Sequence, residues 1–147
     1  MALQVIEETA TTQARPGAVF ALLRDGSTWP DWSPLGSFEL VEPGDGVPEG
    51  LGAIRIFRTK RVASREQVNV VEPDERFGYV LLSGMPLKDY EALVTLRAEN
   101  GGTTIHWRST FRAKVPGTGW LYRWQLGRFI AQVVRGLAAR AEVSAVG

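Results

Sequence analysis

The C-terminal segment constrains the fold most strongly, because it is long, uninterrupted and apolar on one side only. No proline occurs from Gly119 to about Val143, and a helix of that length spans roughly 37 Å. Apolar residues recur there at three- and four-residue spacing, namely Leu126, Ile130, Val133, Val134, Leu137 and Ala141. The opposite arc of the helical wheel holds Gln125, Arg128, Gln132, Arg135 and Glu142. This pattern predicts a helix that lies on another layer and faces water with its other side.

The residues before this helix predict the layer on which it lies. A strand is expected over Leu3–Gln13, followed by a short helix over Pro16–Arg24 that begins with proline at its first position. Residues 25–34 (DGSTWPDWSP) predict a second, shorter helix or a tight loop. Residues 35–114 read as strand, with a turn at 44–48, after which five strands are expected: Ala53–Lys60, Ala63–Val71, Arg76–Ser83, Asp89–Ala98 and Thr103–Lys114.

The connections between these strands are short and rich in turn-forming residues. They are Glu72-Pro73-Asp74-Glu75, Ser83-Gly84-Met85-Pro86 and Asn100-Gly101-Gly102. Connections of this length join antiparallel neighbours, since a parallel crossover needs about a dozen residues. A sheet of about seven strands curls strongly, so the long helix can cover only part of its concave face. The sequence therefore predicts a space between the sheet and the helix.

Alternation along the last two strands predicts which side chains face that space. On one face of the last strand lie Ile105, Trp107, Ser109 and Phe111, and on the other lie His106, Arg108, Thr110 and Arg112. The apolar set is expected to face inward. In the preceding strand the inward row is Tyr90, Ala92, Val94 and Leu96, alternating with Asp89, Glu91 and Arg97.

Length and composition fit one ordinary domain over residues 1–147. The chain is 44% hydrophobic and 22% charged, which allows a core and a pocket inside it. Basic and acidic residues are interspersed and sum to +1, so no basic tract is expected to hold nucleic acid or an anionic membrane, and nucleic acid is disfavoured as a partner. No apolar run approaches the ~18 residues of a membrane span, and MALQVIEET turns acidic where a signal peptide is hydrophobic. A cytoplasmic location without stable membrane insertion is expected, and a homodimer is left open.

The chemistry open to the chain is narrow, because it has no cysteine and one histidine. Disulfides, thiolate chemistry and most metal or imidazole sites are therefore disfavoured. No metal ligand set and no cofactor are expected, and no carboxylate pair, phosphate-binding loop or nucleophile motif identifies catalytic residues. His106 is out of phase with Trp107, so it is expected on the wet convex face rather than as a general base.

The order of elements resembles the START-like, or SRPBCC, family, and within it the small bacterial members called polyketide cyclase/dehydrase. The resemblance covers the whole chain. Its more specific motifs are Pro16–Leu23 with Val19-Phe20, Trp29–Pro34, Val70–Phe77, Gly101–Trp107 and Gly117–Leu137. It implies an α+β helix-grip fold: a curved antiparallel sheet of about seven strands, two short helices and a long C-terminal helix across the concave face. It also implies a hydrophobic cavity that holds lipids, sterols or polyketides, usually without a metal or organic cofactor.

Several side chains are candidates for the wall of such a cavity. We expect ligand contacts from Trp107, Phe111, Ile105, Tyr90, Val94, Tyr79, Ile56, Arg123, Ile130 and Val134. Arg58 and Glu91 are further polar candidates, although a bulge would turn either outward. Arg123 either extends into water or guards the entrance of the cavity. Trp29 and Trp32 are expected to pack the short helices against the sheet edge. Trp120 and Trp124 are expected over the loop before the long helix or partly exposed at the cavity mouth.

The sequence thus favours binding of a hydrophobic or amphipathic small molecule over catalysis. An alternative is a cofactor-independent aromatase/cyclase that folds a polyketide chain. A third is a protein-interaction module of the co-chaperone type, which would present a contiguous exposed apolar patch. The sequence does not select the ligand.

Overall fold

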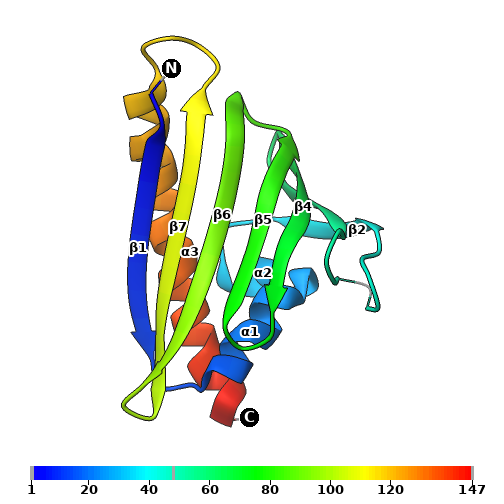
Figure 1. Cartoon of the computed structure of the whole chain (residues 1–147), viewed down its shortest axis with the longest axis vertical. Coiled ribbons are helices and arrows are strands. Elements are labelled where there is room, and N and C mark those ends of the chain that lie inside the picture. Colours follow the sequence, from blue (N-terminus) through cyan, green and yellow to red (C-terminus); the bar gives the residue numbers. More distant parts are fainter. Residues whose placement is uncertain (1, 48, 147) are drawn as a thin grey trace.

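A curved sheet of seven antiparallel strands forms the body of the protein, as the computed structural model shows for residues 2–47 and 49–146 (Figure 1). Its strands are β1 (Gln4–Thr12), β2 (Ser37–Glu42), β3 (Ile54–Thr59), β4 (Val62–Glu72), β5 (Arg76–Ser83), β6 (Leu87–Glu99) and β7 (Gly102–Ala113). The helical elements are α1 (Pro16–Arg24), the 3₁₀ turn η1 (Gly26–Thr28), α2 (Trp29–Trp32) and α3 (Gly119–Val146). This is the α+β helix-grip arrangement that the sequence predicted.

The strand order is β1-β7-β6-β5-β4-β3-β2, and every adjacent pair is antiparallel. Consecutive strands from β2 to β7 are therefore neighbours, as the short connections predicted. Asp74 and Asn100 have φ values of 63° and 50° in two of these turns, a conformation that Asp and Asn tolerate better than most residues. The first strand closes the series by pairing with the last, so β1 and β7 lie at one side of the sheet.

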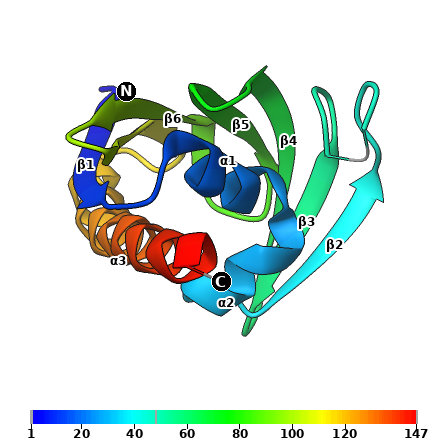
Figure 2. The same cartoon turned by 90° about the horizontal axis from the view of Figure 1, so that it is seen from below.

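The helices share the concave face of the sheet between them. Helix α3 contacts β1 and β7, whereas α1 contacts β5 and β6. Figure 2, seen along the sheet, shows α1, α2 and α3 side by side within the curve of the strands. The long helix therefore covers one part of the concave face and the two short helices cover the rest. This confirms the expectation that α3 alone cannot seal the sheet.

The predicted boundaries agree closely with the observed ones. The first helix and β5 have the predicted bounds, and β6 is longer at both ends than predicted. Residues 25–34, expected as a short helix or a loop, contain η1 and α2 in direct succession. The side chain of Asp25 starts this segment by accepting hydrogen bonds from the backbone and hydroxyl of Ser27.

Burial along α3 follows the predicted arc. Ile130, Val133, Val134, Leu137 and Ala141 are each at most 2% exposed, and Leu126 is partly buried against the core. The residues of the opposite arc are exposed. Alternation also assigns the faces of β6 and β7 as predicted, with one exception. Thr110 is buried on the outward phase, where it lies between Val5 and Glu91 of the flanking strands.

A glycine fixes how closely α3 approaches α2. A Cβ atom at Gly136 would overlap the carbonyl oxygen of Trp32, so only glycine permits the observed distance between the two backbones. Gly127, in the same helix, has open space around it. Gly136 and Gly127 share the same secondary structure and differ in their surroundings, so alanine substitutions at the two positions can be compared directly.

Gly136→Ala is expected to destabilise the fold by about 1–3 kcal/mol, because the added methyl group has to push α3 away from α2. Gly127→Ala should instead stabilise it by about 0.5–1 kcal/mol, the usual gain of alanine over glycine in a helix. Chemical denaturation of both variants measures the two effects. Equal changes in the free energy of unfolding would contradict the close approach at Gly136.

Candidate functional site

Trp29 lies at the centre of the aromatic interior rather than at the sheet edge. Its ring stacks on Phe57 of β3, with 5.0 Å between the ring centres, and meets Trp107 of β7 edge to face, with 5.9 Å between the ring centres. The ring centre of Tyr79 of β5 lies 6.0 Å away, also edge to face. The indole nitrogen of Trp29 donates a hydrogen bond to the carbonyl of Leu23. The side chain is 2% exposed. The short α2 therefore places one large ring over the middle of the concave floor.

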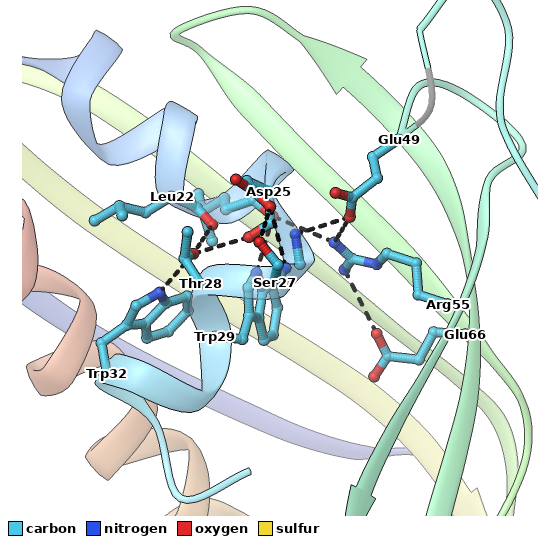
Figure 3. A network of polar contacts seen from close by, with 11 residues as sticks. Leu22, Asp25, Ser27, Thr28, Trp29, Trp32, Glu49, Arg55 and Glu66 are labelled. Carbon is cyan, nitrogen blue, oxygen red and sulfur yellow. Dashed lines mark hydrogen bonds and ion pairs between the residues drawn. The ribbon is translucent and has the colours of Figure 1, made fainter. Parts of the chain in front are cut away.

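A fully buried arginine lies beside this ring. The guanidinium carbon of Arg55 is 5.0 to 5.2 Å from the ring centres of Trp29, Phe57 and Phe77, and the side chain has no exposed surface. Its Nη1 is 3.4 Å from Glu49 Oε1 and from the carbonyl oxygen of Leu23, while Nη2 is 3.6 Å from Glu66 Oε1 (Figure 3). Burying a charge is costly unless it is paired, and here two carboxylates face one cation.

The two carboxylates differ from ordinary glutamates because they have lost water. Burial raises the pKa of Glu66 to about 7, against the attraction of Arg55. Burial also raises the pKa of Glu49, against a hydrogen bond from the backbone of Gly26 and the attraction of Arg55. One cation cannot neutralise two ionised carboxylates, so the cluster is electrically balanced when one of them is protonated. Glu66 is therefore poised to exchange a proton near neutral pH.

The inner face of the sheet continues this polarity from strand to strand. After Arg55 on β3 and Glu66 on β4 come Tyr79 on β5, Tyr90 on β6 and Ser109 on β7. Tyr90 and Ser109 share a hydrogen bond of 3.0 Å between their hydroxyl oxygens. Burial raises the pKa of Tyr79 well above its ordinary value and that of Tyr90 to about 12, so both phenols stay protonated at neutral pH. These five side chains form a polar row across the otherwise apolar floor.

Four buried polar atoms of this interior have no hydrogen-bond partner among the described residues. They are Nε and Nη2 of Arg55, Oε1 of Glu66 and Nε1 of Trp107. Unsatisfied buried groups are rare in native proteins, because each loses its hydrogen bonds to water on folding. Three of the four atoms belong to the Arg55–Glu66 pair, and two of these, Nη2 and Oε1, face each other at 3.6 Å, an ion pair too long for a hydrogen bond. The pair can therefore donate to an oxygen of a bound molecule and accept from its hydroxyl.

Most of the sequence-predicted candidates lie in the interior. Each of the following is at most 5% exposed: Trp107, Phe111, Ile105, Tyr90, Val94, Tyr79, Ile130 and Val134. They come from β5, β6, β7 and α3, so the structure does bring them around one core. Their contact with a ligand stays a prediction, since burial alone is also what a solid core requires.

The predicted phase of β3 was wrong by one residue. Arg55 and Phe57 are the buried residues of the inner face, whereas Ile56 is only partly buried and is paired with Glu39 and Arg65. Arg58 shares the phase of Ile56 and forms an exposed ion pair with Glu39 at 2.8 Å. Ile56 and Arg58 therefore face away from the concave floor.

Glu91 and Arg123 also lie outside the interior. Glu91 is exposed on β6, on the phase opposite to Tyr90 and Ala92. Arg123 is exposed near the start of α3, as the solvent-facing alternative for this residue predicted. A salt bridge between Arg123 and a ligand carboxylate inside the fold is not available in this arrangement.

His106 lies on the convex face, as predicted. Its side chain is 39% exposed, and Nε2 is 2.9 Å from Oε2 of Glu7 on β1. The hydrogen bond with His106 lowers the pKa of Glu7. The imidazole thus forms a surface pair between two neighbouring strands and has no access to the interior.

The sequence reasoning missed Arg55, Glu66 and the central place of Trp29. Glu66 is the direct cross-strand partner of Arg55, and opposite charges at paired positions are a recognisable signal once the register is known. The register was not known, because the alternation in residues 53–60 allows either Ile54 and Ile56 or Arg55 and Phe57 on the inner face. Ile56 was predicted to face inward, and this prediction proved wrong.

Three hollows of the described surface lie elsewhere. One groove of about 480 Å³ runs between residues 31–34 and the C-terminal half of α3. Another lies at the Gly101 turn beside Thr12, and a third beside Pro16 and Asp74. In residues 2–47 and 49–146 no group of three or more His, Asp or Glu side chains is arranged to hold a metal ion, and no helix combines the length and apolarity that crossing a bilayer requires.

Comparison with known proteins gives a consistent result. The sequence profile of the family described as "Polyketide cyclase / dehydrase and lipid transport" matches residues 4–142. No curated protein matches the chain in sequence at a significant level.

Solved structures share the fold at low identity. A START superfamily protein from Mycobacterium smegmatis superposes with a TM-score of 0.81 at 12% identity, covering 95% of this chain and 97% of its own. A protein from Thermus thermophilus gives 0.77 at 18% identity, covering 96% and 99%. The Bacillus cereus protein XoxI gives 0.74 at 16%, covering 95% of both chains.

The raised pKa of Glu66 predicts a specific pH dependence of stability. The folded protein binds the proton of Glu66 more tightly than the unfolded chain does. This proton therefore contributes its full stabilisation of the fold below about pH 4.5, and that stabilisation is lost as pH rises through about 7. Relative to Glu66→Gln, the wild type should lose on the order of 3 kcal/mol of unfolding free energy between about pH 5 and pH 8. Urea denaturation across this range measures the difference.

Glu39→Gln is the matched control, since it makes the same change in an exposed ion pair, whose contribution is small. Its unfolding free energy should stay within about 1 kcal/mol of the wild type at each pH. Parallel pH profiles for the wild type and Glu66→Gln would show that Glu66 keeps an ordinary pKa in the fold.

Proposed function

Because the chain belongs to the family of polyketide cyclases/dehydrases and lipid transport proteins, we propose that it binds a hydrophobic small molecule carrying one oxygen-containing polar group. The ligand lies between the sheet and α3, with its polar group at Arg55 and Glu66. The observation that carries this proposal is the set of buried polar atoms on Arg55, Glu66 and Trp107 that form no hydrogen bond, two of which meet only as an ion pair of 3.6 Å. A single domain over residues 1–147 and a cytoplasmic location belong to the same proposal.

The apolar part of the ligand contacts side chains that are already withdrawn from water. In the proposal these are Ile105, Trp107, Phe111, Tyr90, Val94, Tyr79, Ile130 and Val134. Burial of apolar ligand surface contributes about 25 cal/mol per Å². Lipids, sterols and polyketides all offer enough apolar surface for this mode of binding, and they differ in their polar ends.

The polar end of the site selects for an oxygen function. Arg55 offers N–H donors at Nε and Nη2, which suit a carbonyl, hydroxyl or carboxylate oxygen. Glu66 accepts a hydrogen bond from a hydroxyl when ionised and donates one when protonated. A ligand oxygen beside the pair supplies the hydrogen bonds that these groups do not form within the protein, which offsets the cost of burying them.

Binding in this place requires a rearrangement of side chains. In the structure Trp29 packs directly against Trp107 and Tyr79, so a ligand on Trp107 takes the position of the Trp29 ring. Trp29 belongs to α2, a single helical turn preceded by η1. A short element of this kind can shift more readily than the sheet on which it lies, and we assign it the role of admitting the ligand.

Polyketide cyclisation is a second candidate, favoured by the proton that Glu66 exchanges near pH 7. In a poly-β-ketone, ionised Glu66 removes a proton from a carbon between two carbonyls, and that carbon forms a bond to another carbonyl carbon of the same chain. Arg55 N–H groups stabilise the resulting alkoxide, which takes the proton back from Glu66. The carbon skeleton closes without an oxidant or a metal.

The first test compares two fluorescent probes, a fatty acid and the corresponding hydrocarbon without the carboxyl group. The wild type should bind the acid at least about tenfold more tightly, equivalent to ~1.4 kcal/mol. The preference should be larger at about pH 6 than at about pH 8, because ionised Glu66 repels a carboxylate. Glu66→Gln should still bind the acid more tightly than the hydrocarbon. Any pH dependence of this preference that remains in Glu66→Gln should come from titration of the probe's own carboxyl group.

Glu39→Gln again serves as the control and should behave as the wild type. The outcomes separate the parts of the proposal. Equal binding of both probes would contradict a polar subsite at Arg55 and Glu66. Failure of the wild type to bind either probe would contradict the hydrophobic site itself.

The second test replaces Trp107 by alanine. Trp29 fills the ligand's place beside this ring in the structure and can move into the space that truncation leaves, so Trp107→Ala should cost roughly 1–3 kcal/mol of stability and weaken fatty acid binding by at least about tenfold. In a solid core the same change typically costs 3–5 kcal/mol. If the wild type binds no probe and the variant loses more than about 4 kcal/mol, side chains fill the interior and the binding proposal fails.

A further inference from the structure

Two tryptophans at the start of α3 are exposed to solvent. Trp120 is 64% exposed and Trp124 is 56% exposed, whereas Trp29, Trp32 and Trp107 are buried. Exposure of so much aromatic surface costs free energy that folding could recover by burial. Val115, just before the helix, is also 54% exposed. The apolar surface therefore gathers where β7 passes into α3, at the end of the molecule that also holds the N-terminus (Figure 1).

The same region carries positive charge without acidic residues of its own. Over the whole chain the charges nearly balance, yet residues 100–141 contain no Asp or Glu and seven basic residues: Arg108, Arg112, Lys114, Arg123, Arg128, Arg135 and Arg140. This corrects the expectation that the chain has no basic tract to hold an anionic membrane.

The acidic residues of the sheet that lie beside β7 are on its two neighbouring strands. They are Glu7 and Glu8 on β1 and Asp89 and Glu91 on β6. Glu7 is engaged by His106 and by Arg108 at 3.6 Å. The basic residues from Lys114 onward thus dominate the start of α3.

Trp120, Trp124 and Arg128 share one helix face. Trp120, Trp124 and Arg128 recur at four-residue spacing, which places them in a line along the helix. The guanidinium carbon of Arg128 lies 5.2 Å from the ring centre of Trp124, a cation–π distance. We call this surface, formed by Lys114, Val115, Trp120, Trp124 and Arg128, the tryptophan tip. It faces away from the buried arc of Ile130 and Leu137.

We propose that the tryptophan tip docks the protein reversibly on an anionic lipid surface. Tryptophan prefers the boundary between headgroups and hydrocarbon, because its ring is apolar while its N–H can still hydrogen-bond. Lysine and arginine are attracted to anionic headgroups, and stable but reversible attachment generally needs both kinds of contact. The charge of the tip selects a negative surface, and the exposed rings select one with an accessible apolar layer.

This proposal goes beyond the buried ligand site and does not depend on it. None of the five side chains of the tip belongs to the polar row or to the residues around Trp107. Docking concerns the outer face of α3, whereas the proposed ligand site lies under its inner face. The two can therefore be tested separately.

The test is co-sedimentation of the full chain with vesicles of phosphatidylcholine alone and of an equimolar mixture with phosphatidylglycerol. The protein should bind the anionic vesicles and not the neutral ones, and added salt should release it. Its tryptophan emission should shift to shorter wavelength on binding, since Trp120 and Trp124 leave water. The double variant Trp120→Ala/Trp124→Ala should weaken binding by at least about tenfold, equivalent to ~1.4 kcal/mol.

A second pair of variants tests the charge. Lys114→Gln/Arg128→Gln should also weaken binding to anionic vesicles and reduce its dependence on salt. Matched controls are Leu82→Ala, which removes a side chain 45% exposed on β5, and Arg140→Gln, which removes the same charge at the other end of α3. Both should bind within about twofold of the wild type, because neither contributes to the tip.

Three results would overturn the proposal. The wild type does not sediment with anionic vesicles, it binds neutral and anionic vesicles equally, or the double tryptophan variant binds as well as the wild type. In the first case, light scattering that shows a dimer for the wild type and a monomer for the tryptophan variant would assign the tip to a second copy of the chain instead. Ligand binding in the interior is untouched by any of these outcomes.

Discussion

The guanidinium of Arg55 connects separate parts of this fold through one buried charge. It reaches the end of α1 through the carbonyl of Leu23, the segment before β3 through Glu49, and β4 through Glu66. Glu49 in turn accepts a hydrogen bond of 2.8 Å from the backbone of Gly26 in η1, and Trp29 of α2 lies over the cation. The short helices are thus fixed on the sheet around this cation.

Such an arrangement is an inefficient way to stabilise a protein. Replacement of buried ion pairs by apolar side chains of similar volume is often neutral or favourable, and an aromatic pocket could hold a leucine or methionine at position 55 without orphaned donors. The retained charge is easier to explain as part of a site than as part of a core. This is the physical reason to propose ligand binding in the interior and not in the surface hollows.

Much of the fold was predictable because its signals are local and long. The 3.6-residue period of α3 extends over many turns, Pro16 marks the start of α1, and short turns connect neighbouring strands. The inner faces of β6 and β7 were predictable for the same reason, since each strand is long enough for its alternation to be unambiguous.

The Arg55–Glu66 pair was not predictable, because it depends on register and on contacts distant in sequence. β3 has six residues, and both of its faces carry apolar side chains, so a shift of one residue turned Arg55 outward and Ile56 inward. The pairing of Arg55 with Glu49 and the position of Trp29 over β3, β5 and β7 follow from the path of the chain between 25 and 53. Local patterns hold no information about that path.

The basic stretch formed by β7 and α3 also influences how the molecule is oriented as it approaches a charged surface. Outside residues 100–141 the acidic residues outnumber the basic ones, although the chain as a whole has a net charge of +1. The protein is therefore an electric dipole that is nearly neutral overall. In the field of a charged surface a dipole experiences a torque, so the molecule rotates toward a preferred orientation while it diffuses. At 0.1 M salt the field of the surface is largely screened beyond a Debye length of about 10 Å, so the orientation on approach, and not only the strength of attachment, depends on ionic strength.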